Sequence, residues 1–256
     1  MFIPLHDANG LEHIKFQYVT IGLIAANVVV FLLTNFGSQQ FTIAATYGFG
    51  FVPSVAFDTV ELPPELHYIP DDLSFVTYAF LHADLFHLGG NMVFLWVFGD
   101  NIEDAMGHMR FLLFYLLCAI GAALFHGMVD PASQEPLIGA SGAIAGIVSA
   151  YLILHPRVKV WVLAFARIPL RIPAWIALSL WIAMQVVMFL MGGEEQISWA
   201  CHIGGIITGA VLVLILKRSD VPLFDREVVT PNAVKVRQDS AVRPLEAKPV
   251  PRWGRQ

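Results

Sequence analysis

Charged residues are scarce in this chain of 256 residues. Asp, Glu, Lys and Arg together make up 14% of the sequence, whereas a soluble domain averages about 25%. Hydrophobic residues make up 57% of the chain, and the mean hydropathy is +0.66. This balance excludes an ordinary soluble globular domain and indicates an integral membrane protein.

Cysteine is rarer still, with only Cys118 and Cys201, both inside apolar runs. They form neither the paired motif of a zinc site nor the framework of a small secreted domain. The N-terminal region also lacks the basic stretch and small-residue cleavage site of a secretory signal. We therefore expect the first apolar run to remain as a membrane anchor.

Apolar runs that approach the length of a bilayer span occur six times. A membrane helix needs about 20 such residues, and the runs lack the two-residue alternation of barrel strands. The sequence therefore predicts an all-α membrane protein, a bundle of six transmembrane helices. The predicted helices lie at 18–36, 88–107, 111–129, 139–155, 173–191 and 199–216.

The basic residues all lie on one side of this arrangement, while the loops at 37–87, 130–138 and 192–198 contain none. Because cytoplasmic loops carry the excess of Lys and Arg, we expect both termini in the cytoplasm.

Three regions follow from this topology: a cytoplasmic N-terminal segment at 1–17, a six-helix membrane domain at 18–216, and a cytoplasmic tail at 217–256. The tail is rich in proline and charge and is expected to be disordered. The long outer loop at 37–87 contains apolar stretches such as YGFGFVPSVAF. It has two interpretations, a partly membrane-immersed or interfacial element and an ordinary extracellular loop.

Strongly polar residues stand near the outer ends of three different runs: Asn91, Ser141 and His202. At 1.5 Å of rise per residue, all three lie roughly 20 to 24 Å from the cytoplasmic end of their helix. Polar groups at such depth are costly and usually face the interior of a bundle. The three side chains are therefore expected to converge in one layer.

Glycines accompany two of these positions. Gly142 follows Ser141 and Gly205 follows His202, and each glycine begins a GxxxG spacing that lets helices approach closely. A serine beside glycine also suits helix packing alone, and Asn91 also suits an interhelical hydrogen bond. Close packing of the fourth and sixth helices would itself bring Ser141 toward His202.

The chemistry that unites these residues is nucleophilic acyl transfer. A serine hydroxyl becomes nucleophilic when a neutral imidazole accepts its proton, which predicts a dyad of Ser141 and His202. No carboxylate lies at this depth, so no third member is expected. Ser141 begins its helix, and the free backbone N–H groups there are candidate oxyanion donors together with Asn91 and His87.

Three motifs resemble those of the rhomboid family of intramembrane serine proteases. FLHADLFHLGGNMVFLWVFGDNIEDAMGH has His82, His87 and Asn91 at the spacing of the second-helix signature. IGASGAIAG resembles the GxSG block, and CHIGG followed by TGA resembles the AHxxG block. The motifs stand in the family's order, and the resemblance covers most of residues 75–209.

The resemblance implies a role for each motif residue: nucleophile Ser141, general base His202, oxyanion donors His87 and Asn91, and supporting residues His82, Gly139 and Gly142. It implies cleavage of membrane proteins in or near their transmembrane segments, without metal or organic cofactor. The expected partners are these substrates and the lipid bilayer, with no nucleic acid. The expected location is a bacterial plasma membrane, with the active site opening to the outer face.

The chain departs from the family pattern at a few positions. Cys201 replaces the usual alanine before the histidine, and Ala145 replaces an aromatic residue that packs on the histidine in some members. The outer loop has no arginine. Glu103 and Asp104, near the end of the second helix, are expected to have structural roles.

The sequence leaves three alternatives open. An inactive relative would share the fold, although both Ser141 and His202 are present. A small transporter also has polar residues inside the membrane, but this chain has no series of polar residues that leads from the outer layer to the cytoplasm. A metal site of His82, His87 and His202 lacks the i,i+4 spacing and a nearby carboxylate.

Overall fold

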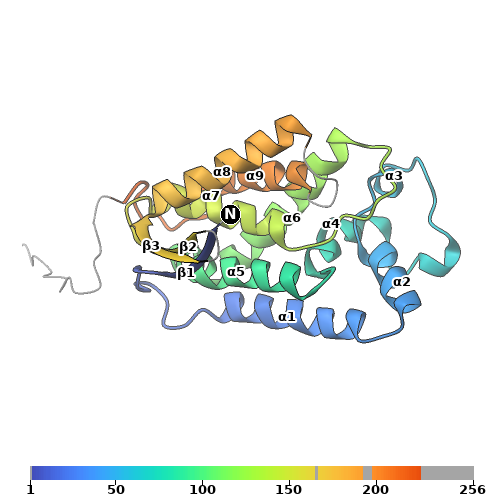
Figure 1. Ribbon diagram of the computed structural model, residues 1–256, viewed down its shortest axis with the longest axis horizontal. Coiled ribbons are helices and arrows are strands. Elements are labelled where there is room, and N and C mark those ends of the chain that lie inside the picture. Colours follow the sequence, from blue (N-terminus) through green and yellow to red (C-terminus); the bar gives the residue numbers. More distant parts are fainter. Residues whose placement is uncertain (1, 165–166, 193–197, 226–256) are drawn as a thin grey trace, which may run out of the picture.

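The computed structural model describes residues 2–164, 167–192 and 198–225 and is mostly helical (Figure 1). Each of the six predicted apolar runs forms a helix whose bounds agree with the prediction within a few residues. These helices are α1 (Tyr18–Asn35), α5 (Leu85–Met106), α6 (His108–Val129), α7 (Ser141–Leu154), α8 (Ala174–Met191) and α9 (Trp199–Leu216).

Among the helices that the structure describes, α1, α6, α8 and α9 are long and apolar enough to cross a membrane. The other two differ for a physical reason. Helix α7 has 14 residues and is mostly buried, and α5 carries several buried polar side chains. Most of α7 and the C-terminal half of α5 are buried by other parts of the chain, so lipid does not dictate their composition there as it does at the periphery of the bundle.

The segment at 37–87 folds into short helices instead of an irregular loop. They are α2 (Gln39–Phe49), α3 (Pro53–Ala56), η1 (Pro64–Leu66), η2 (Asp71–Leu73), α4 (Ser74–Thr77) and η3 (Tyr78–Phe80). Phe51 and Tyr78 of this segment are fully buried. Backbone hydrogen bonds between Phe51 and Leu137 join it to the chain just before α7. The segment thus covers one end of the bundle (Figure 1).

A three-stranded antiparallel sheet lies at the opposite end, within the described part of the chain. Its strands, in the order β1–β2–β3, are β1 (Phe2–Asp7), β2 (Lys159–Ala164) and β3 (Ile168–Pro173). Val160 and Val162 face the core, whereas Trp161 between them is 41% exposed. The helical bundle agrees with the prediction, but the predicted all-α class is wrong in one respect, because the structure also contains this sheet. The strands of the sheet are short, and β1 and β2 come from distant parts of the sequence. No local sequence pattern therefore predicts the sheet.

Asp7, the last residue of β1, is buried against the helices. Its carboxyl group accepts hydrogen bonds from the hydroxyl of Tyr151 at 2.5 Å and from Nδ2 of Asn101 at 3.1 Å. Burial raises the pKa of Asp7 from 3.8 to about 7, because the charged form loses its solvation. The strand is therefore anchored by a carboxyl group that favours its neutral form.

Glu103, in the last turn of α5, is fully buried and holds the start of α1. Its carboxylate accepts hydrogen bonds from the backbone N–H groups of Val19 at 3.0 Å and Thr20 at 2.8 Å, and from the Thr20 hydroxyl at 2.7 Å. The first N–H groups of a helix have no partner within the helix, so this side chain caps α1 from a distance. Glu103 thus has the structural role expected of it.

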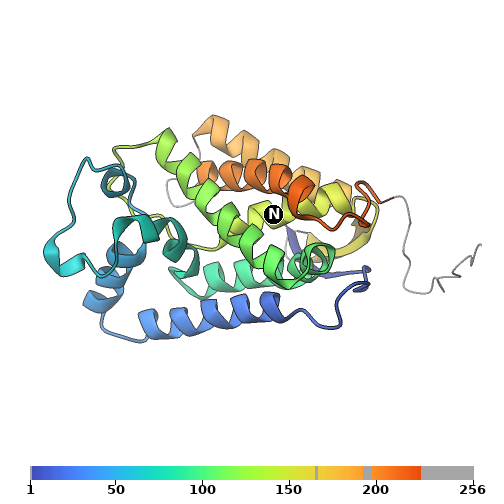
Figure 2. The same cartoon turned by 180° about the vertical axis from the view of Figure 1, so that it is seen from behind.

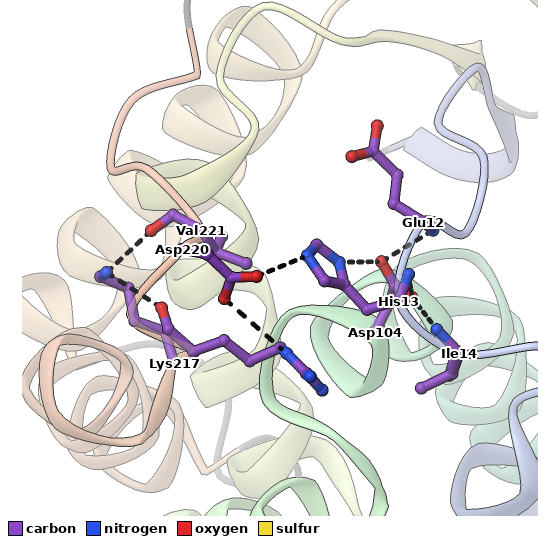
Figure 3. A network of polar contacts seen from close by, with 8 residues as sticks. Glu12, His13, Ile14, Asp104, Lys217, Asp220 and Val221 are labelled. Atoms are coloured by element: carbon purple, nitrogen blue, oxygen red, sulfur yellow. Dashed lines mark hydrogen bonds and ion pairs between the residues drawn. The ribbon is translucent and has the colours of Figure 1, made fainter.

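Asp104 joins three segments at the sheet end of the bundle (Figure 3). Its carboxylate accepts hydrogen bonds from the backbone N–H groups of Glu12, His13 and Ile14. The ring of His13 lies between two carboxylates, with Nδ1 3.2 Å from Asp104 and Nε2 3.4 Å from Asp220. The N-terminal segment, the end of α5 and the chain after α9 therefore meet here.

The prediction of a disordered tail is wrong for residues 217–225, and residues 226–256 lie outside the described residues. The N–H of Arg218 donates to the carbonyl of Ala105, and that of Phe224 donates to the carbonyl of Ile153. These acceptors belong to the last turns of α5 and α7, where carbonyl groups lack partners within the helix. The start of the tail is ordered because it satisfies them.

Candidate active site

Ser141 is the first residue of α7, at the end of the helix away from the sheet. Gly139, two residues earlier, has a φ of +120°, and its N–H donates to the carbonyl of Tyr78 at 3.0 Å. A methyl group at Gly139 would lie 2.7 Å from Nε2 of His87. Glycine is therefore required here by both the backbone conformation and the close approach of His87.

The structure brings Ser141 and His202 together. Oγ of Ser141 lies 2.9 Å from Nε2 of His202, and both side chains are half-buried, so a reactant can reach them. The two residues are 61 positions apart and come from different helices. This is the approach that the sequence predicts from its polar layer.

Contact between α7 and α9 makes this approach possible, and both views show the two helices side by side (Figures 1 and 2). A methyl group at Gly205 would lie 1.9 Å from the carbonyl oxygen of Gly142. A methyl group at Gly209 would lie 2.3 Å from that of Gly146. The glycines of both GxxxG spacings face each other, and the backbones touch, as the small-residue pattern predicts.

Gln185 of α8 is a member of this site that sequence reasoning missed. Its Oε1 lies 2.7 Å from Nδ1 of His202, on the side of the ring opposite Ser141. A carboxylate is the usual third group, and the sequence has none at this depth. Yet Gln185 is the one amide in the apolar run at 173–191, and it lies 14 residues after Arg171, or about 21 Å along a helix, which is the depth of the other polar residues.

Two tryptophans pack around the histidine ring. The ring of Trp181 lies 6.1 Å from that of His202 at an interplanar angle of 33°, and the ring of Trp199 lies 5.9 Å away, edge-on, at 89°. Rings from α8 and α9 therefore flank His202, while position 145, where some members of the resembled family carry an aromatic residue, is Ala. Ala145 itself lies against Gly205, where a larger side chain would push α9 away.

Asn91, His82 and His87 form a second group, beside Gly139. Nδ2 of the buried Asn91 donates to Nε2 of His82 at 2.9 Å, and the rings of His82 and His87 meet edge-on at 5.0 Å. Nδ2 of Asn91 would lie 3.7 Å from a methyl group at Gly139, close to the start of α7. Nδ2 of Asn91 and Nε2 of His87 thus lie beside Gly139, two residues before the start of α7.

Asp84 fixes the start of α5 and with it the position of His87. Its Oδ1 accepts hydrogen bonds from the backbone N–H groups of Phe86 at 2.7 Å and His87 at 2.8 Å. These bonds, chiefly the one from His87, hold the pKa of Asp84 below its usual value. The aspartate is therefore charged at neutral pH and caps the helix.

A three-histidine metal site fits this arrangement poorly. The two ring nitrogens of His202 face Ser141 and Gln185, so neither is free to join His82 and His87 around an ion. Among the residues that the structure describes, no cluster of three or more His, Cys, Asp or Glu side chains has the geometry of a metal site. The arrangement suits proton transfer between a hydroxyl and an imidazole instead.

Comparison with known proteins identifies a family model and several curated proteins to which this chain is similar. A family model described as the Rhomboid domain matches residues 71–219. RHOMBOID-like protein 12, mitochondrial, of Arabidopsis thaliana is 26% identical over 217 residues, which cover 78% of this chain and 59% of that protein. Presenilin-associated rhomboid-like protein, mitochondrial, of Homo sapiens is 30% identical over 196 residues, which cover 75% and 47%.

Rhomboid protein 1, mitochondrial, of Saccharomyces cerevisiae is 30% identical over 148 residues, covering 56% of this chain and 42% of that protein. The chain thus spans about half the length of the curated relatives it matches. These three relatives are named as mitochondrial proteins, so they do not support the bacterial plasma membrane expected from the sequence.

Proposed function

Because the chain belongs to the rhomboid family, we propose that it is an intramembrane serine endopeptidase whose nucleophile is Ser141 and whose general base is His202. The observation that carries the proposal is the 2.9 Å contact between Oγ of Ser141 and Nε2 of His202. A serine within hydrogen-bond reach of an imidazole, whose other nitrogen is held by a third group, is the arrangement of an activated nucleophile.

The reaction begins when Nε2 of His202 takes the hydroxyl proton of Ser141 as Oγ attacks the carbonyl carbon of a peptide bond. The carbonyl oxygen becomes an oxyanion, which the backbone N–H of Ser141, the amide of Asn91 and the ring of His87 stabilise. His202 then gives its proton to the departing amine, and an acyl-enzyme remains on Oγ. Water then attacks the acyl carbon while the same nitrogen takes its proton, the bond between that carbon and Oγ breaks, and His202 returns the proton to Oγ, which releases the second product and restores Ser141.

We further propose that α1, α5, α6, α7, α8 and α9 all span the membrane. The distribution of basic residues supports a cytoplasmic position for the sheet end of the bundle and for both termini. Ser141 begins α7 at the opposite end, so the site opens toward the outer face, beneath the segment 37–87. Water needed for the second half of the reaction enters from that face.

The substrates in this proposal are membrane proteins cut in or near a transmembrane segment. A helical segment hides its peptide bonds in hydrogen bonds, so it must unwind before attack. We expect cleavage to require helix-weakening residues near the scissile bond and a small residue at the acyl position. Replacing that small residue by Phe or Asp in a model substrate is expected to suppress cleavage, and cleavage without loss would contradict this preference.

The test of the reaction is labelling of the detergent-solubilised protein with a fluorophosphonate, which reacts with activated serines. The wild type is expected to be labelled, whereas Ser141→Ala and His202→Ala are not. Ser149→Ala is the matched control, because Ser149 lies in the same helix but donates to the carbonyl of Gly146. Its labelling is expected to equal that of the wild type.

A second control, His67→Ala, removes a partly exposed histidine of the outer segment and is also expected to leave labelling unchanged. Folded wild-type protein that stays unlabelled, beside an active serine hydrolase that reacts, would refute the proposal. The chain would then be better explained as an inactive relative that binds membrane proteins.

A further inference from the structure

We infer that Gln185 is a positioning residue that holds His202 in the tautomer whose Nε2 can accept the proton of Ser141. The inference rests on the proposed function, and it adds a neutral third member to the expected dyad. The contact between Oε1 of Gln185 and Nδ1 of His202, at 2.7 Å, is its starting point.

The burial of Gln185 is unusual for its helix. Gln185 is 1% exposed, whereas the other buried residues of α8 are Ala174, Ala177 and Leu178, near the sheet end. Most of the helix is apolar and faces outward, with Leu180 and Leu190 strongly exposed. Burying an amide is costly unless it is hydrogen-bonded, so this position is specified by its polar contacts.

The direction of these contacts determines the tautomer of His202. Nε2 of Gln185 donates to the carbonyl of Trp181, four residues earlier, at 3.2 Å. This bond orients the amide so that its oxygen faces the histidine ring. Since an amide oxygen only accepts hydrogen bonds, Nδ1 of His202 must carry the proton.

Once Nδ1 carries the proton, Nε2 of the neutral ring has a free lone pair. That lone pair faces Oγ of Ser141, 2.9 Å away. The chain of hydrogen bonds therefore runs in one direction, from the serine hydroxyl through the histidine and the glutamine to the carbonyl of Trp181. The other tautomer would present an N–H to the serine and could not act as a base.

The use of an amide in place of a carboxylate fits the surroundings. An ionised side chain facing the middle of a membrane protein is expensive, whereas an amide accepts the same hydrogen bond without charge. Trp181 and Trp199 pack against the ring of His202 from other directions. Together with Gln185, these tryptophans hold the ring of His202, and Ala145 provides no aromatic ring for this purpose.

The experiment compares fluorophosphonate labelling of the full-length wild type, Gln185→Leu and Gln185→Glu, together with the melting temperature of each. Leu keeps much of the volume and removes the acceptor. Glu in its protonated form reproduces both hydrogen bonds of Gln185. Ser179→Leu is the control for a change of polarity, because Ser179 lies on the exposed side of the same helix.

We expect Gln185→Leu to lower the maximal labelling rate roughly 10- to 100-fold, because the histidine loses the acceptor that selects its tautomer. The probe concentration at half-maximal rate is expected to stay near the wild-type value. Gln185→Glu is expected to recover most of the lost rate although it melts at a lower temperature. Ser179→Leu is expected to match the wild type.

A merely structural role predicts a different pattern, in which labelling follows the melting temperature and Glu is no better than Leu. That pattern, or a Gln185→Leu protein that is labelled at the wild-type rate, would overturn the inference while leaving the proposed protease intact. An unlabelled wild type would overturn both, so the two failures are distinguishable.

Discussion

Gly205 and Gly142 touch through their backbones: a methyl group on Gly205 would lie 1.9 Å from the carbonyl oxygen of Gly142. No rotation of a side chain can relieve such a contact, because the opposing atom belongs to the main chain. The separation of α7 and α9 is therefore set by glycine. The distance between Ser141 and His202 depends on that separation.

Gly205→Ala tests this relationship. The added methyl group is expected to push α9 away from α7, lower stability by about 1 to 3 kcal/mol and reduce labelling at Ser141 more than tenfold. Thermal unfolding and fluorophosphonate labelling measure the two effects. Gly22→Ala is the control, since a methyl group there meets no atom within 4 Å. Normal labelling of Gly205→Ala would show that the site tolerates a wider spacing.

Asn91 is expected to act on the oxyanion, and His82 to act through Asn91. Asn91→Ala should lower the labelling rate by about 100-fold, the usual cost of one oxyanion donor. His82→Leu should lower it less, because it removes only the acceptor that orients the amide of Asn91 at 2.9 Å. In the double variant the second change is expected to add little. Additive losses would place His82 in an independent role.

Glu103 is expected to hold α1 on the bundle. Glu103→Ala leaves the N–H groups of Val19 and Thr20 without their acceptor and is expected to cost about 2 to 4 kcal/mol. The free energy of unfolding in mild detergent measures the loss. Glu135→Gln, a change at an exposed outer position, is the control. An unchanged stability of Glu103→Ala would mean that other contacts hold α1.

Asp7 is expected to make the attachment of β1 sensitive to pH. Because its pKa is raised from 3.8 to about 7 in the folded chain, the stabilisation is complete below pH 3.8 and is lost as the pH rises through 7. Each pKa unit corresponds to about 1.4 kcal/mol, so ionisation costs up to roughly 4 kcal/mol.

Asp7→Asn keeps an acceptor for the Tyr151 hydroxyl but cannot ionise. The melting temperature of the wild type relative to this variant is therefore expected to fall between pH 5 and pH 8. A constant difference across that range would show that Asp7 remains accessible to water when the strand is in place.

The sequence alone determined the positions of the long helices and the meeting of Ser141 with His202. Long runs of apolar residues indicate helices that face lipid, because an unpaired peptide group is costly in lipid and a helix pairs its peptide groups internally. The glycine spacings after Ser141 and His202 report on close helix contact, because only small residues permit it. Both signals are local, and each can be read from a short stretch of sequence.

Only the tertiary structure decided which distant groups complete the site and close the ends of the bundle. Gln185 accepts from His202 because α8 lies beside α9, and Glu103 caps α1 because α5 ends beside it. The sheet likewise needs Asp7 and Val160 to pair across the length of the chain. A neutral amide, a buried carboxylate and a short strand carry no strong local pattern. Their roles arise from hydrogen bonds whose partners become neighbours only when the chain folds.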